Sequence, residues 1–167
     1  MSLGRKSLFT CLTNPSTLHS FKDDNAMIHE LNTSHSDILI HWFNNPVALF
    51  LSSPESCYPI ISVDDAFFKD TQTYGYFQDE QLVACVSVRL GQILHLFVEP
   101  KHRKKGYAKA LLKFLLKQDK SELYAYVHGQ QREQIRLFSS VNFLKTAEVS
   151  SFSFENIEEE FIKFISE

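Results

Sequence analysis

A short basic loop at residues 101–106 stands between an apolar strand pattern and a helical pattern. The first turn of a helix leaves backbone N–H groups without acceptors and carries the positive end of the helix dipole. Gly106 lets the backbone approach a ligand closely, and Arg103, Lys104 and Lys105 add positive charge beside it. Because these features together attract anions, the loop is predicted to bind phosphate groups.

The charge of the whole chain limits what this loop binds. The 167 residues carry a formal net charge of -3 at pH 7, which argues against a general nucleic-acid-binding protein. A solvated surface run is one alternative reading of residues 101–105, and a DNA-binding site is another, which the net acidity opposes. We therefore expect a local, anionic partner and no nucleic acid.

The loop must be held by secondary-structure elements on both sides. The hydrophobic patterns of the sequence predict these elements. The predicted elements are strand 27–31, helix 38–51 broken near Pro46, helix 64–69, strands 73–78, 82–89 and 92–98, helix 106–118, strand 122–127, helix 131–140 and strand 143–154. Strands 73–78 and 82–89 form a hairpin, and strands 92–98 and 122–127 a right-handed parallel crossover. This order predicts an α+β (mixed α/β) single domain, with a central, mixed but mostly antiparallel sheet flanked by helices.

We place this domain at residues 27–154. The two ends of the chain have sequence patterns that differ from those of the domain. Residues 1–26 have weak periodicity and form a segment of uncertain structure. At residues 155–167, apolar side chains at helical spacing predict a C-terminal helix that packs on the domain. Phe161 and Phe164 of this helix offer a contact for a homodimer.

The cysteines and apolar runs indicate the compartment. Cys11, Cys57 and Cys85 have neither paired nor metal-like spacing, so no disulfide framework and no metal site are predicted. No secretion signal is convincing, and no apolar stretch is long enough to span a membrane. These features favour a reducing, cytoplasmic setting.

The loop and its flanks resemble a known family. Residues 103–108 fit the pattern Arg/Gln-x-x-Gly-x-Gly/Ala of the GNAT acetyltransferases, with Val98-Glu-Pro100 closing the strand before it and a long helix after it. The resemblance implies that backbone N–H groups of the loop bind the pyrophosphate of acetyl-CoA, namely those of Arg103, Lys104, Lys105, Gly106, Tyr107 and Ala108. It also implies that the pantetheine arm pairs with the backbone of Leu96, Phe97 and Val98, where the strand splays from its neighbour.

A second segment resembles the family less closely. The family pattern Asn-x-x-Ala-x-x-Leu-Tyr-x-x-x-Gly-Phe falls on residues 131–143. Gln131 stands at the asparagine position and still offers an amide to the cofactor. Phe138 stands at the tyrosine, which in the family often protonates the leaving thiolate, and phenylalanine has no hydroxyl for that task.

The residues for the chemistry are less clear than those for the cofactor. Attack on a thioester needs a neutral amine, so a base must remove a proton, directly or through water. The candidates are His95 and Glu99, on one face of the same strand. Tyr126, with Tyr124 on the same face of the next strand, is a candidate acid, although water also protonates a thiolate. For each of these side chains the alternative is a purely structural role, either packed in the core or exposed to solvent.

The resemblance implies an acetyl-CoA-dependent N-acetyltransferase that moves an acetyl group directly to a primary amine of a small molecule or peptide. The alternative is an acyl-CoA-binding module of GNAT fold with weak or lost catalysis, which Phe138 motivates. The acceptor site is expected within residues 34–70, which are rich in aromatic side chains. Acidic residues there, Glu55, Asp64 and Asp65, offer charge to a cationic amine or serve as helix caps.

Overall fold

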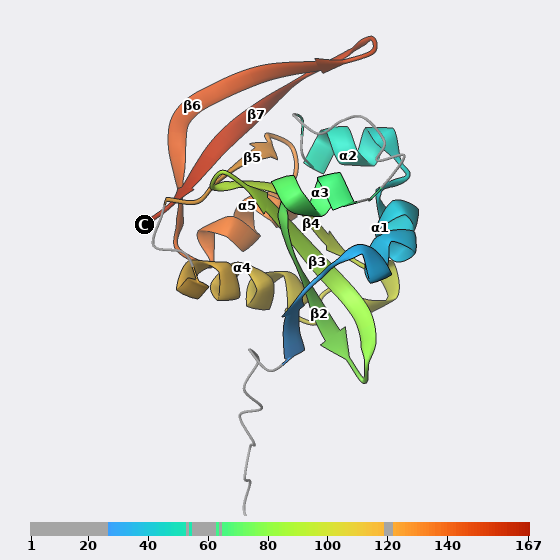
Figure 1. The fold of residues 1–167 in the computed structure, drawn as a ribbon. Coiled ribbons are helices and arrows are strands. Elements are labelled where there is room, and N and C mark those ends of the chain that lie inside the picture. Colours follow the sequence, from blue (N-terminus) through green and yellow to red (C-terminus); the bar gives the residue numbers. More distant parts are fainter. Residues whose placement is uncertain (1–26, 53, 55–62, 64, 119–121) are drawn as a thin grey trace, which may run out of the picture.

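The structure, a computed structural model, describes residues 27–52, 54, 63, 65–118 and 122–167 (Figure 1). The predicted segment 1–26, together with Cys11, Cys57, Glu55 and Asp64, lies outside these residues. The elements are β1 (Ile28–Glu30), a 3-10 turn (Thr33–His35), α1 (Ser36–Phe43), α2 (Pro46–Ser52), α3 (Asp65–Asp70), β2 (Gln72–Gln78), β3 (Gln81–Arg89), β4 (Gln92–Val98), a 3-10 turn (Pro100–His102), α4 (Tyr107–Gln118), β5 (Tyr124–His128), α5 (Arg132–Ser139), β6 (Phe143–Phe154) and β7 (Ile157–Ser166).

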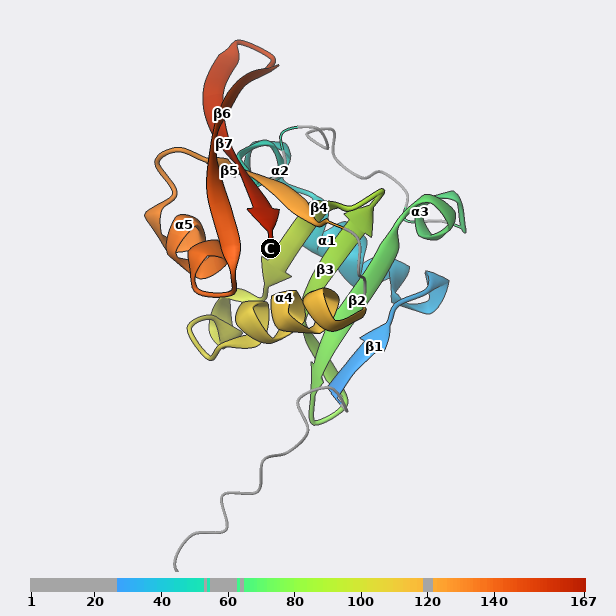
Figure 2. The same ribbon diagram turned by 90° about the vertical axis from the view of Figure 1, so that its left-hand side faces the viewer.

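The strands form one sheet in the order β1-β2-β3-β4-β5-β7-β6. Neighbouring strands are antiparallel except β4 and β5, which are parallel. Helices α4 and α5 cover one face, and α1, α2 and α3 lie on the other (Figure 2). The predicted mixed, mostly antiparallel sheet flanked by helices is confirmed.

Each face of the sheet has its own hydrophobic core. Helix α4 buries Leu111, Leu112 and Leu115 against the strands, while Lys113 and Lys117 stay exposed, as its helical spacing predicts. On the other face, Leu39 and Phe43 of α1 pack with Cys85 of β3 and with α3. Burying a leucine or phenylalanine contributes about 1.5–3 kcal/mol, so these two cores fix α1, α3, α4 and α5 against the sheet. Helix α2 packs in a third cluster, where its Phe50 meets Phe154 and Phe161.

The predicted C-terminal helix is wrong, because residues 157–166 form strand β7 between β5 and β6. Phe161 and Phe164 are both 0% exposed, on opposite faces of this strand. A central strand is buried on both faces, so its apolar residues need not alternate. In this segment they happen to recur at a spacing that is also typical of a helix. The dimer contact predicted through these two side chains is also wrong, since both lie inside the chain's own core.

The β2–β3 turn has a strained backbone that predicts a stabilising substitution. Asp79 and Glu80 have φ of 49° and 65°, and this left-handed conformation costs a residue with a Cβ about 1–2 kcal/mol. Glu80→Gly removes that strain from the folded state. Glycine also raises the conformational entropy of the unfolded chain, which cancels part of the gain in stability. We expect the free energy of unfolding in urea to rise by about 0.5 kcal/mol. Glu80→Ala removes the same charge but keeps the Cβ, and a gain there would contradict this explanation.

Candidate active site

The sheet opens between β4 and β5. Among the described residues, these strands pair only at Gln92 and Tyr124. On its other side β4 pairs with β3 as far as Val98, with a bulge that leaves Leu94 as the extra residue. A bulge bends its strand and increases the local twist, so the far half of β4 diverges from β5.

The backbone of β4 presents hydrogen-bonding groups to this gap. The Glu99 N–H donates to the carbonyl oxygen of Val83 on β3 at 3.0 Å. Successive residues of a strand point these groups to alternate sides, so the backbone of Phe97 faces β3, whereas Leu96 and Val98 face the gap. The open edge therefore offers the pairing surface of a strand without a strand to fill it.

A cavity of about 560 Å³ passes through the gap. Its walls come from helices on both faces of the sheet. Trp42 and Ala48 belong to α1 and α2 on one face, and Ala108 and Leu137 belong to α4 and α5 on the other. Since the sheet separates these helices (Figure 2), the cavity connects the two faces through the splayed strands. A long ligand can therefore reach the opening from one face and a second reactant from the other.

The basic loop forms an anion-binding cradle at the start of α4. Lys104 and Gly106 have positive φ, 61° and 91°. The first helical acceptor is the Gly106 carbonyl oxygen, which bonds the Ala110 N–H at 2.9 Å. Within the described chain, the N–H groups of residues 106–109 have no backbone acceptor. A Cβ at position 106 would meet nothing within 4 Å, so space for a phosphate group exists directly beside these donors.

Side chains of the loop fix it to its surroundings. The Tyr107 hydroxyl donates to Gln78 Oε1 on β2, and its ring lies 4.7 Å from that of Tyr76. Arg103 Nε donates to the Val98 carbonyl oxygen at 3.2 Å, and Arg103 also lines the cavity. The helix start is thus held against both β2 and the end of β4, which leaves its backbone to meet a ligand.

His95 lies in the cavity wall, with its ring packed among aromatic side chains. Its side chain is 3% exposed and stacks on Phe43 with ring centroids 4.5 Å apart. Neither ring nitrogen has a hydrogen-bond partner in the described part of the structure. Burial, and secondarily the charge of Arg89, lowers the pKa of the imidazole from 6.5 to about 4. At neutral pH the ring is therefore uncharged and has a free lone pair.

Glu99, the other candidate base, is engaged elsewhere. Its side chain is 24% exposed and lies 3.1 Å from Lys101 Nζ and 3.6 Å from His102 Nε2. It is not among the described residues that line the cavity. Glu99 thus compensates the charge of the turn that leads into the loop, and it is poorly placed to meet an acceptor.

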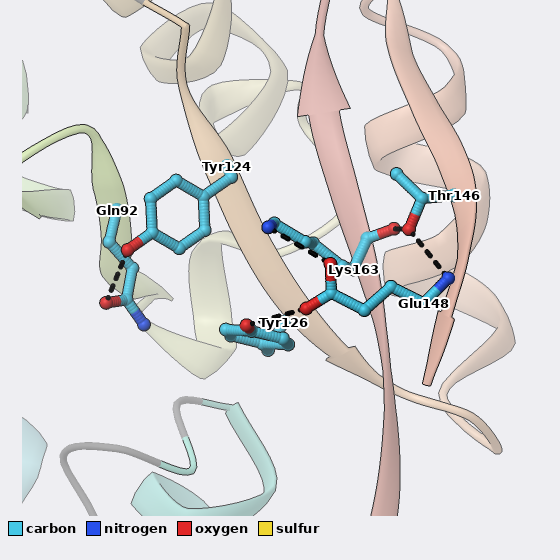
Figure 3. Close-up of polar contacts among 6 residues, drawn as sticks. All are labelled: Gln92, Tyr124, Tyr126, Thr146, Glu148 and Lys163. Carbon is cyan, nitrogen blue, oxygen red and sulfur yellow. Dashed lines mark hydrogen bonds and ion pairs between the residues drawn. The ribbon is translucent and has the colours of Figure 1, made fainter. Parts of the chain in front are cut away.

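Tyr126, the candidate acid, is held by the neighbouring strands (Figure 3). Its hydroxyl donates to Glu148 Oε1 at 3.2 Å, and Lys163 Nζ lies 3.1 Å from the other oxygen of that carboxylate. Burial first, and then Glu148, raises the pKa of the Tyr126 hydroxyl. Tyr124 turns the same way and donates to Gln92 Oε1 at 3.3 Å. Tyr126 borders a small adjoining pocket rather than the main cavity.

Phe138 and Gln131, at the tyrosine and asparagine positions of the family pattern, have different surroundings. Phe138 is buried, with its ring 5.1 Å from Phe143 and 5.9 Å from Phe164, so it belongs to the core. Gln131 lines the cavity, and its Nε2 donates to the Leu51 carbonyl oxygen at 3.4 Å. This amide joins the start of α5 to the end of α2 across the opening.

The cavity also contains residues that sequence reasoning missed. These are Glu133, Gln134 and Leu137 of α5. Ala48 and Leu51 of α2 also line the cavity, within the range 34–70 expected for the acceptor. Gln134 and Leu137 are three residues apart, a spacing that places them on one helix face. This spacing could have indicated that Gln134 and Leu137 line the site, because residues 131–143 already resemble the family pattern.

Among the described residues, no group of three or more His, Cys, Asp or Glu is arranged to hold a metal ion. No helix among them is both long enough and apolar enough to cross a lipid bilayer.

Residues 30–143 match the sequence profile of the acetyltransferase (GNAT) family, and no curated protein matches the chain. Three solved structures illustrate the fold. Spermidine N-acetyltransferase from Vibrio cholerae, in complex with CoA and spermine, is 13% identical over 83% of this chain and 92% of that one, with a TM-score of 0.68. A GNAT acetyltransferase from Elizabethkingia anophelis with acetyl-CoA bound is 17% identical over 84% and 96%, with a TM-score of 0.58. Arabidopsis thaliana NAA60, in complex with a bisubstrate analogue, is 20% identical over 83% and 95%, with a TM-score of 0.62.

Proposed function

We propose, since this chain belongs to the GNAT family of acetyltransferases, that it transfers the acetyl group of acetyl-CoA directly to a primary amine of a small molecule or peptide. The observation that carries the proposal is the cavity that crosses the sheet between β4 and β5, beside an anion cradle. This arrangement lets a cofactor and an amine meet in the gap from opposite faces.

The residues present fit acetyl-CoA. The N–H groups at the start of α4 and the open space over Gly106 suit the pyrophosphate. The backbone edge at Leu96 and Val98, which pairs with no described strand, suits the amide-containing pantetheine arm, and Gln131 lines the same cavity. When bound, acetyl-CoA supplies an acetyl thioester, which the acceptor amine attacks.

The chain's own residues then assist the transfer. The amine nitrogen forms a bond to the acetyl carbon, the bond from that carbon to sulfur breaks, and the amine loses one proton. His95, uncharged at neutral pH, accepts that proton, directly or through water. The Val98 N–H faces the gap and donates to the acetyl oxygen as negative charge develops there. Phe138 has no hydroxyl to protonate the thiolate, so water does so, and His95 returns its proton to the hydroxide left in the solvent.

A second candidate function is an acyl-CoA-binding module without efficient catalysis. The observation that favours it is the position of the hydroxyl groups near the gap. Phe138 offers none, and the hydroxyl of Tyr126 is bonded to Glu148. Such a module would keep the cradle and the open strand edge and lack turnover.

We also propose a cytoplasmic location. Cys85 is a free, buried thiol, and burial raises its pKa, so it packs as an apolar group. Free cysteines are typical of a reducing compartment.

A titration with acetyl-CoA tests the proposal. At 100 times the dissociation constant, bound ligand stabilises a fold by about 2.7 kcal/mol, which raises the melting temperature of a domain this size by about 5–10 °C. We expect such a shift, and release of CoA when an amine panel is added. Absence of binding to both acetyl-CoA and CoA at millimolar concentration would overturn the proposal. Binding without turnover would support the module.

A further inference from the structure

The face of the cavity formed by α1 and β4 is built from flat rings. Trp42 stacks on Phe97 with centroids 4.8 Å apart and planes inclined by 28°. Phe43 stacks on His95, and both of these rings are almost completely buried. All four line the cavity. Phe43 and His95 thus form a floor, and the half-buried Trp42 and Phe97 form an edge that a ligand can touch.

The charged residues of the cavity lie outside the elements that carry these rings. Among the described lining residues, the charged ones are Arg103 of the loop and Glu133 of α5. The Glu133 side chain is 86% exposed and lies 3.9 Å from Lys104 Nζ. The contributions of α1 and α2 to the lining include no carboxylate. Along the rings, a polycation would lose its hydration without gaining a counter-charge from the described residues of α1 and α2.

His95 adds a polar contact that suits one amine. It is more than nine-tenths buried, it faces the cavity, and its two nitrogens have no partner among the described residues. One nitrogen of a neutral imidazole accepts a hydrogen bond, so the ring can hold the N–H of an uncharged amine.

We infer that the acceptor is an aromatic monoamine, a small molecule with a planar ring, one amino group and no second charge. This inference rests on the function proposed above and specifies its substrate class. The planar ring stacks against Trp42 and Phe97, and the amino group reaches His95. An alkylamine with pKa near 10.4 is neutral in only about one molecule per thousand at pH 7.4, so the apolar wall selects that neutral form.

Trp42 provides the measurement, because it is the one tryptophan of the chain. Its fluorescence, recorded for the full protein with CoA present, reports amine binding without requiring turnover. We expect 2-phenylethylamine to give a saturable change at a concentration at least tenfold lower than 2-cyclohexylethylamine, which has the same length but no planar ring. We expect no saturable change with 1,4-diaminobutane or spermine. Rates of CoA release with acetyl-CoA should follow the same order.

A matched pair of variants assigns the effect to the ring wall. Phe97→Leu keeps an apolar side chain but removes the stacked ring, so binding of 2-phenylethylamine should weaken about fivefold and its advantage over 2-cyclohexylethylamine should shrink. Phe68→Leu, on α3 and outside the described cavity lining, should keep the wild-type preference. Thermal melts of both variants verify folding.

The outcomes separate this inference from the proposed function. If acetyl-CoA binds but spermine, 1,4-diaminobutane or a peptide amine is preferred, the inference fails and the acetyltransferase proposal stands. Equal binding of the phenyl and cyclohexyl amines, or no fluorescence change with either, also overturns the inference. If neither acetyl-CoA nor CoA binds, the proposed function itself fails.

Discussion

Gly106→Glu is expected to lower the affinity for acetyl-CoA at least a hundredfold. Gly106 has a φ of 91° and open space where its side chain would be. A glutamate there fills that space with a carboxylate, which takes the donors of the α4 N-terminus and repels the phosphates. A single repulsive charge at close range is worth several kcal/mol when partly desolvated. Isothermal titration calorimetry at fixed ionic strength measures the loss.

The fold should survive this substitution, which makes it a clean test. Strain at positive φ costs about 1–2 kcal/mol, and a carboxylate at a helix N-terminus returns about 0.3–1 kcal/mol. Gly129→Ala is the matched control, because its Cβ would lie at an ordinary 3.6 Å from the Glu160 carbonyl oxygen. That variant should bind acetyl-CoA like the wild type. Unchanged affinity in Gly106→Glu would show that the pyrophosphate binds elsewhere.

The stability of the protein is expected to fall by about 3 kcal/mol between pH 6.5 and pH 4 because of His95 alone. The folded state holds the pKa of His95 at about 4, below its ordinary 6.5. Between these values the unfolded chain binds a proton that the folded protein does not. Acid therefore favours unfolding, and the contribution of His95 is fully present above pH 6.5 and lost as the pH falls to 4.

His95→Phe removes this titration while keeping a ring against Phe43. The pH dependence of the urea-unfolding free energy should then flatten by about 3 kcal/mol over that window. His41→Gln, which replaces an exposed histidine of α1, controls for the loss of one imidazole and should keep the wild-type curve. Identical curves for His95→Phe and wild type would contradict the burial argument. A fall in kcat of about a hundredfold in His95→Phe would mark its role as proton acceptor.

Local signals predicted most of the fold. Alternating apolar residues around Asp79-Glu80 predicted the β2–β3 hairpin, and the spacing of Leu111, Leu112 and Leu115 predicted α4. The C-terminal strand was missed, although a two-residue turn, Glu155-Asn156, joins Phe154 to Ile157. Such a short link between two apolar runs is a hairpin signal. The helical spacing of the apolar residues outweighed this hairpin signal. A strand buried on both faces does not alternate apolar and polar residues, so the usual strand pattern was missing.

The sequence is far more informative about the cradle than about the acceptor side. Residues 103–108 are contiguous in the chain, so a local sequence motif is enough to predict how they are arranged in space. Trp42 and Phe97 meet only through the packing of α1 on β4. Tyr126 read as a free hydroxyl because its partners, Glu148 and Lys163, lie on strands that follow later in the chain. Contacts of this kind depend on strand order, which no local pattern encodes.

The place of β7 has a consequence for how the chain folds during synthesis. Strands β1 to β4 pair with sequence neighbours, so that half of the sheet and its covering helix assemble from local contacts. Strand β5 is joined to β4 at one residue pair and gains its continuous ladder from β7, which leaves the ribosome only after β6. One side of the opening between β4 and β5 therefore forms only after a distant segment is made, and a nascent chain exposes the edge of β5 until β7 pairs with it.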